Sequence, residues 1–201
     1  MKTTILTIAI AVSTLFGISQ TTYAATGSNP QVTQLADVSN ISEIEVHGNV
    51  QLYLSDGSAN QVKVYNNYYS ENALVQDENG VLRITSYSPE KLVVWVTANQ
   101  LAKLSAYDNA EVKSFGKLST IDLDVRLFNN ASAKLDMDAF TASISLDDCT
   151  TADLTGKITN GNIQYTHVST LNTDGLDVAH LVKTVKSHRF GHVRPTEFAS
   201  L

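Results

Sequence analysis

The segment LSAYDNAEV (residues 104–112) introduces a pattern that returns three times further along the chain. In each copy an apolar strand runs into a polar corner and ends on an apolar residue. The later copies are LFNNASAKL (127–135), ISLDDCTTADL (144–154) and IQYTHVSTL (163–171). Their closing residues, Val112, Leu135, Leu154 and Leu171, are 23, 19 and 17 residues apart. A period near 20 residues that is built from strands predicts an all-β, solenoid-like fold.

The corners of this repeat are rich in Asn and Asp. Both residue types tolerate a left-handed backbone and form hydrogen bonds with their own chain, so they suit a tight corner. If the coils stack, outward side chains form columns, and such columns are the usual binding surface of a solenoid. The predicted corners are Asp108-Asn109, Asn129-Asn130, Asp147-Asp148 and Thr166-His167.

The first half of the chain predicts separate strands and β-hairpins. Apolar residues alternate with polar ones, as in Val50, Leu52 and Leu54, and this period of two puts them on one buried face. Asn79-Gly80 predicts a tight hairpin turn, because both residues accept positive φ. The same alternation in the second half predicts that two inward sets begin at Ile121 and Phe140.

The N-terminus has the layout of a secretory signal peptide. Lys2 precedes an apolar run over residues 5–18, and Thr22-Tyr23-Ala24 supplies small residues before a cut after Ala24. The run is shorter than the roughly 20 residues that span a bilayer, so we expect export rather than a membrane span. The predicted organisation is a signal peptide (1–24), a flexible leader (25–37), a β-solenoid domain (38–182) and a basic tail or end cap (183–201).

Charge and cysteine content narrow the functions. The chain has 14 basic and 20 acidic residues, a net charge of −6, and loss of Lys2 with the leader leaves 13 against 20, or −7. An acidic exported protein is a poor candidate for binding nucleic acid. Its single cysteine, Cys149, allows no internal disulfide; it is either a small buried or corner residue or a site of intermolecular pairing.

Several segments resemble the head GIN domain, a family of secreted Bacteroidota proteins that carries an auto-transporter adhesin label. They are ISEIEVHGNVQLYL (41–54), GVLRI (80–84) and VVWVT (93–97), followed by the repeated corners, and the resemblance covers roughly residues 38–181. It implies a right-handed β-helix and a location in the periplasm, at the cell surface or outside the cell. It brings no ligand and no catalytic residue. The corners depart from the family's Gly-Ser-Gly pattern, with Asn and Asp in place of Gly.

Five outward residues are the candidates for ligand contact: Tyr53, Asp122, Asp124, Asp147 and Asp148. A tyrosine ring can stack on a sugar, and clustered carboxylates can bind Ca²⁺, which takes six to eight oxygen ligands. A solvated outer face also explains the acids, because they alternate with inward apolar residues, and we favour that interpretation. We therefore expect no metal and no cofactor.

Catalytic patterns are weak in this sequence. His188 and His192 are four residues apart, but Arg189 lies between them and no acidic residue does, unlike the His-Glu-x-x-His motif. There is no Gly-x-Ser-x-Gly nucleophile motif. Asp147, Asp148 and Arg126 are the residues to test for a carbohydrate-active β-helix enzyme.

The sequence thus predicts an exported, non-catalytic adhesin or binding module. Surface glycans and matrix proteins are its expected partners, and it is expected to form a homo-oligomer through its coil ends. The alternatives are a structural module of an envelope complex and, less favoured, the β-helix enzyme.

Overall fold

The computed structural model describes residues 32–35, 38, 40–65 and 73–187. Every regular element in these ranges is a strand, which confirms the all-β prediction. The segments 1–31, 66–72 and 188–201 lie outside the described residues, and with them the signal peptide, Tyr68, Tyr69 and the pair His188 and His192. The strands are β1 (Val32–Leu35), β2 (Glu43–Gly48), β3 (Val50–Asp56), β4 (Gln61–Tyr65), β5 (Ala73–Glu78), β6 (Val81–Ser86), β7 (Leu92–Ala98), β8 (Lys103–Tyr107), β9 (Glu111–Leu127), β10 (Ser132–Leu146), β11 (Thr151–Thr166) and β12 (Thr170–Lys186).

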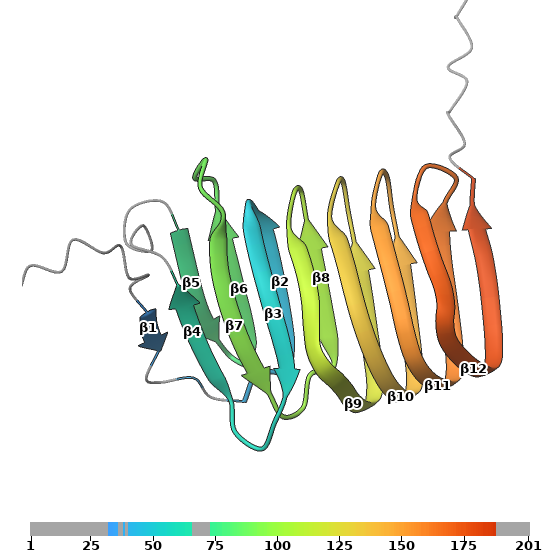
Figure 1. The fold of residues 1–201 in the computed structure, drawn as a ribbon, viewed down its shortest axis with the longest axis horizontal. Coiled ribbons are helices and arrows are strands. Elements are labelled where there is room, and N and C mark those ends of the chain that lie inside the picture. The colour runs from blue at the N-terminus through green and yellow to red at the C-terminus, as the bar shows by residue number, and fades with distance from the viewer. Residues whose placement is uncertain (1–31, 36–37, 39, 66–72, 188–201) are drawn as a thin grey trace, which may run out of the picture.

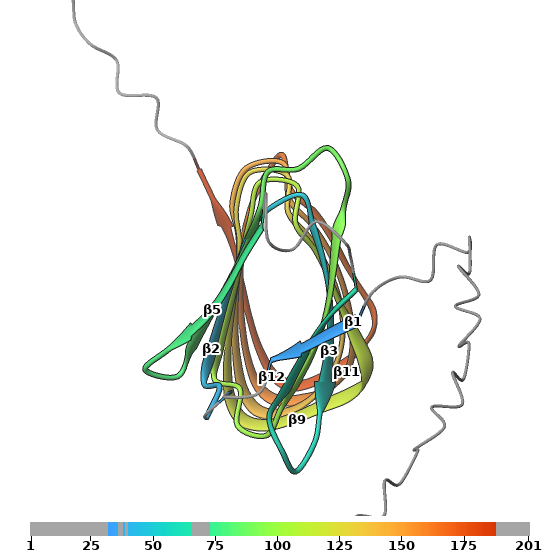
Figure 2. The same ribbon diagram turned by 90° about the vertical axis from the view of Figure 1, so that its left-hand side faces the viewer.

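All twelve strands belong to one curled sheet (Figure 1). The start of β9 pairs with β3 and its end pairs with β8, so this single strand passes around one edge of the molecule. β10, β11 and β12 follow the same path and pair in parallel with the preceding strand. Seen end-on, the strands trace stacked, flattened loops (Figure 2).

This path creates two broad outer surfaces. The outward side of β4, β7, β3 and the first part of β9–β12 is called the β3 face below. The outward side of β6, β2, β8 and the last part of β9–β12 is called the β2 face. Each face therefore carries side chains from successive paired strands of the curled sheet.

The predicted corners are left-handed where the sequence places Asn or Asp. Asp108, Asn129 and Asp148 have φ values of 61°, 61° and 59°. Neighbouring corners also bond to one another, because Asn129 Nδ2 donates to Asp108 Oδ1 over 2.9 Å. The fourth corner uses hydroxyl groups instead, with Thr166 Oγ1 and Ser169 Oγ 2.7 Å apart. Asn79 and Gly80, at φ 54° and 82°, form the predicted hairpin between β5 and β6.

The register of the repeat differs from the one expected. Val112 aligns with Ala133 rather than Leu135, and Leu171 aligns with Ala152 rather than Leu154. The shift is two residues in each case, and residues two apart point to the same side of a strand. Alternation alone cannot distinguish these registers.

The core is a column of aliphatic side chains between the two faces. Leu52, Leu104, Val125 and Ile144 are fully buried or nearly so, and each contributes about 1.5–3 kcal/mol by leaving water. Ile121 and Phe140, expected to face inward, are instead 74% and 58% exposed. They lie where the strands pass around the edge. Leu118 and Leu123, the inward residues on either side of Ile121, are an odd number of positions apart, which strict alternation does not allow. The alternation resets there, so the prediction for both residues was wrong.

Strand structure is also present on both sides of residues 38–182. β1 lies within the stretch expected as a leader and pairs antiparallel with β4. β12 continues to Lys186 as a strand. Among the described residues, no helix is long and apolar enough to cross a membrane.

Candidate functional site

Four aromatic rings gather on the β3 face. Trp95 of β7 lies at the centre, stacked on Tyr53 of β3 with ring centroids 4.7 Å apart. Tyr65 of β4 and Phe115 of β9 meet the same indole at 6.5 and 5.2 Å, both tilted by 57°. These four residues are called the aromatic platform below. They come from four strands, three of which are neighbours only because the sheet order is β4-β7-β3.

A bulge in β9 brings Phe115 to this platform. Lys113 pairs with Lys134 and Lys117 pairs with Asp136, so β9 uses two residues more than β10 over the same step. Gly116 has φ 80°, and the Asp136 N–H donates to Ser114 Oγ over 2.8 Å, which holds the bulge against β10. Bulges often re-aim a side chain near a functional site. Here the bulge leaves Phe115 64% exposed while its ring contacts Trp95.

A hollow of about 340 Å³ adjoins the platform. Its chemistry combines aromatic carbon, ammonium groups, a carboxylate and hydroxyls. Both lysines have acidic partners: Lys134 Nζ lies 3.0 Å from Asp153 and Lys113 Nζ lies 3.5 Å from Glu111. The hollow is lined by Tyr53, Lys113, Ser114, Phe115, Gly116, Lys134, Asp136 and Thr155.

A second ring stack lies on the β2 face. His47, Tyr107 and Phe128 are nearly parallel, with centroids 4.3 and 4.8 Å apart and interplanar angles of 3° and 7°. Stacking covers both faces of the middle ring. Phe128 ends the stack, and it lines a hollow of about 390 Å³ that Asp124 and Asp147 also line.

The two predicted acids in this second hollow are held by cations. Arg126 lies 2.7 Å from Asp124 through its Nη2 atom, and this hydrogen bond raises the pKa of the Arg126 guanidinium above its usual value. Lys186 Nζ lies 3.0 Å from both oxygens of Asp147 and donates to Ser145 Oγ over 2.6 Å. Because each carboxylate already has a cationic partner, neither is presented to a ligand as a bare charge.

The other predicted residues lie apart. Asp122 lines a separate hollow beside Thr120 and Ile121, and Asp148 is exposed at its left-handed corner. Tyr53 alone belongs to the aromatic platform. The five candidates are therefore spread over three hollows and a corner.

Sequence reasoning missed Phe115 and Phe128. Phe115 precedes a glycine in a stretch without regular alternation. That Phe-Gly break was the signal available in the sequence. Its meaning depended on the register of β10, which the pattern did not determine.

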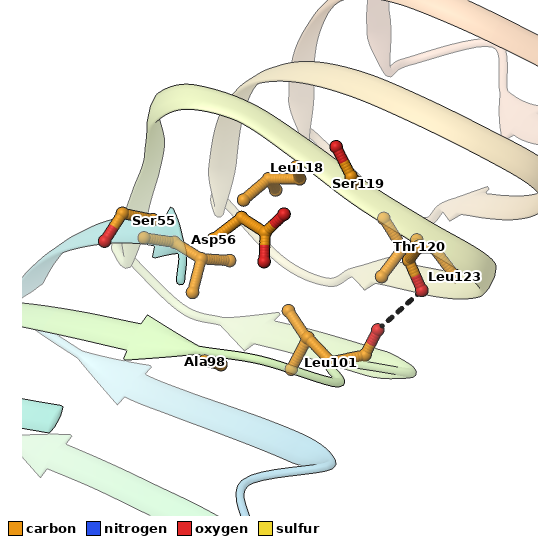
Figure 3. Close-up of a pocket in the computed structure, with 9 residues that line it drawn as sticks. Ser55, Asp56, Ala98, Leu101, Leu118, Ser119, Thr120 and Leu123 are labelled. Atoms are coloured by element: carbon orange, nitrogen blue, oxygen red, sulfur yellow. Dashed lines mark hydrogen bonds between the residues drawn. The ribbon is translucent and has the colours of Figure 1, made fainter. Parts of the chain in front are cut away.

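A small pocket where β9 bends is too small for a ligand (Figure 3). Its volume is about 10 Å³, roughly the space of one water molecule. Leu101, Leu118 and Leu123 point into it, and Thr120 Oγ1 donates to the Leu101 carbonyl over 3.1 Å (Figure 3). It is a packing defect where β9 bends.

No described residues form a group of three or more His, Cys, Asp or Glu side chains placed to hold a metal ion. Cys149 is exposed at the corner between β10 and β11. Neither observation adds a reactive site to the platform or to the second hollow.

Known proteins are similar to this chain mainly in fold. No curated protein matches it. Among solved structures, it is similar to a putative adhesin from Parabacteroides distasonis, with 15% identity, a TM-score of 0.57, and coverage of 78% of this chain and 79% of that one. A putative lipid binding protein from the same species shows 10% identity and a TM-score of 0.46 over 80% and 98% of the two chains. A putative adhesin from Bacteroides fragilis shows 13% and 0.45 over 77% and 97%.

At such low identity the first of these similarities supports the fold alone. The family comparison reaches further, because the model described as "Putative auto-transporter adhesin, head GIN domain" matches residues 40–197. That range contains the aromatic platform, the second hollow and all five predicted contact residues. The chain belongs to the head GIN domain family.

Proposed function

We propose that this protein is an exported, non-catalytic adhesin that binds a surface glycan through the aromatic platform. The adhesin description of its family supports a binding role. The leader sequence supports export, with the periplasm, cell surface or exterior as the destination. The parallel register from β9 to β12, together with the family resemblance, supports a right-handed β-helix as the framework.

The bulged Phe115 is the observation that carries the glycan proposal. An aromatic ring that is 64% exposed costs free energy unless something covers it, and here two extra residues are spent to place it. Sugar rings present C–H groups that pack on such a ring. The hydroxyl groups of a saccharide then reach the ammonium, carboxylate and hydroxyl groups of Lys134, Asp136 and Thr155 in the adjoining hollow.

Glycan-array binding of the purified protein tests this proposal. A hit should lose affinity in Phe115→Ala by about thirtyfold, because truncating a central aromatic anchor costs about 2 kcal/mol or more. Phe140→Ala is the matched control, since Phe140 is 58% exposed on β10 and stands outside the platform. Arrays without any hit would overturn the glycan proposal, as would equal losses in both variants.

The enzyme alternative has one observation in its favour: Asp124 and Asp147 line the same hollow. Glycosidases use such a carboxylate pair. The cations that hold both carboxylates count against free acid and base roles, and they leave the aromatic platform as the better supported site. Asp147→Asn without effect on any hydrolysis detected would remove this alternative.

A further inference from the structure

The edge strands at the two ends of the stack differ in length. At the N-terminal end the sheet terminates in β1, of 4 residues, and β5, of 6 residues. At the other end β12 runs for 17 residues and pairs only with β11 among the described strands. Short edge strands protect a sheet from pairing with another chain, whereas a long one offers a template of free N–H and C=O groups. Within the part of the chain that the structure describes, the C-terminal end is thus the open one.

The last coil also leaves apolar side chains uncovered. In the coil before it, Ile158 and Ile163 are completely buried. In β12, Leu181 and Val185 align with Gly161 and Tyr165 of β11, yet they are 47% and 41% exposed. Leu171, Leu176 and Val178 are only partly buried against the core. Among the described residues, this end therefore combines an unpaired strand edge with exposed apolar side chains, and Lys183 lies between Leu181 and Val185, aligned with the buried Ile163. A second strand along this edge would pair the backbone and cover the apolar side chains.

Charge is divided along β12. Its first part carries Asp174 and Asp177, and its last part carries Lys183 and Lys186. Lys186 already holds Asp147 of the same chain, so Lys183 is the charge that the argument uses. If two copies of β12 run antiparallel, the acidic part of each lies against the basic part of the other. In a parallel arrangement like charges would meet, which is unfavourable between adjacent strands.

We propose that two copies of this chain associate end to end, β12 against β12, antiparallel about a two-fold axis near the middle of the strand. Each copy then supplies the coil that covers the other's core. The arrangement is isologous and closes as a dimer. Head-to-tail growth is disfavoured because the N-terminal end offers only the short strands β1 and β5.

Sedimentation velocity of the purified protein tests the association. We expect a concentration-dependent dimer. Asp177→Lys should weaken it at least tenfold by placing like charges together, and the double variant Asp177→Lys, Lys183→Asp should recover it. Ile121→Lys is the control, because Ile121 is 74% exposed on β9, away from this end. A monomer at every concentration, or open-ended polymers, would overturn the proposal.

Disulfide trapping tests the geometry. In a Cys149→Ser background, Ala179→Cys places a thiol near the proposed axis, where it meets its own symmetry mate. Thr170→Cys places a thiol at the start of the strand, far from its mate. We expect cross-linked dimer under mild oxidation from the first variant and not from the second, with circular dichroism confirming that both are folded. A dimer that cross-links equally at both positions, or only at 170, would contradict pairing through β12.

Discussion

Deleting Phe115 and Gly116 together separates the role of the bulge in binding from any role in folding. Without these residues, Ser114 continues directly into Lys117. Lys113 still pairs with Lys134 and Lys117 with Asp136, so Ser114 takes the position opposite Leu135. β9 then has the regular register that β10 already has with β11. Because two residues are removed, the inward and outward sides of the strand are unchanged.

The structure allows the effect on stability to be worked out. The deletion loses the contact between Phe115 and Trp95, worth about 0.5–1.5 kcal/mol for an aromatic pair. It restores one or two ladder hydrogen bonds, worth about 0.5–1.5 kcal/mol each. These terms nearly offset, so the free energy of unfolding should change by less than about 2 kcal/mol. In a chain of this size that moves the Tm by less than about 8 °C.

The assay pairs thermal unfolding with glycan binding. We expect the deletion variant to unfold cooperatively near the native Tm and to lose binding at least as completely as Phe115→Ala. A buried phenylalanine that supported the fold would instead cost about 3–5 kcal/mol when removed. A variant that aggregates or melts far below the native protein would therefore refute the inference that the bulge serves the surface rather than the core. A stable variant with undiminished binding would refute the platform as the binding site.

Three further predictions concern the framework. Leu104→Ala should lower the free energy of unfolding by about 2–5 kcal/mol because Leu104 is fully buried, whereas Ile121→Ala should change it by less than about 0.5 kcal/mol; urea titration compares them, and equal effects would contradict the core assignment. Asn129→Ala should cost more stability than Asn129→Gly in the same titration, because φ is 61° there and Ala tolerates it poorly; the reverse order would exclude backbone strain as the cause. The hydrogen bond from Lys91 holds the pKa of the Glu111 carboxyl below its usual value, so this pair stabilises the fold above the unfolded pKa of about 4.3 and the stabilisation is lost as the pH falls through the lower folded pKa. The acid side of the Tm-against-pH curve should therefore flatten in Glu111→Gln, and an unchanged slope would refute the assignment.

Local chemistry made the strands and corners predictable. Asn79-Gly80 and Asn129 carry their backbone preference in the residue itself, and the alternation in Val50, Leu52 and Leu54 is a property of one strand. Each of these signals needs only a few neighbouring residues. The predicted turns, corners and strands occur in the folded protein because packing and local backbone preference favour the same conformation.

The bends and the aromatic platform were not predictable in the same way. At Ile121 the chain turns around the edge of the sheet. The bend changes which side of the strand faces the core, but the alternation of apolar and polar residues continues through it unchanged. Phe115 lies on β9 and Trp95 on β7, and both strands pair with β3. The two rings come together only because of the register of β3 with each of these strands. A site assembled across four strands depends on that register. An alternating pattern cannot reveal the register, because residues two apart point to the same side of a strand.

The aromatic platform and the proposed dimer contact lie on different strands, which has a consequence for adhesion. The aromatic rings belong to β4, β7, β3 and β9, and the adjoining hollow extends over β10 to Thr155 of β11, whereas the association involves the free edge of β12 (Figure 1). Pairing at β12 would thus leave both platforms accessible, and a dimer would engage two glycans on one surface. Linked sites can gain about 10²–10⁴ in avidity without any new contact, provided that both reach the surface.

Comparing soluble and immobilised glycan separates this gain from intrinsic affinity. Asp177→Lys should bind a soluble monovalent glycan as the native protein does, because Asp177 lies in β12, outside the platform. On a densely coated surface it should dissociate at least tenfold faster, and the charge-swapped double variant should regain slow release. If the single variant were retained as well as the native protein on that surface, association through β12 would have no part in adhesion. If it also lost the soluble glycan, the substitution on β12 would affect the site itself, and that result would refute independent roles for the platform and the dimer contact.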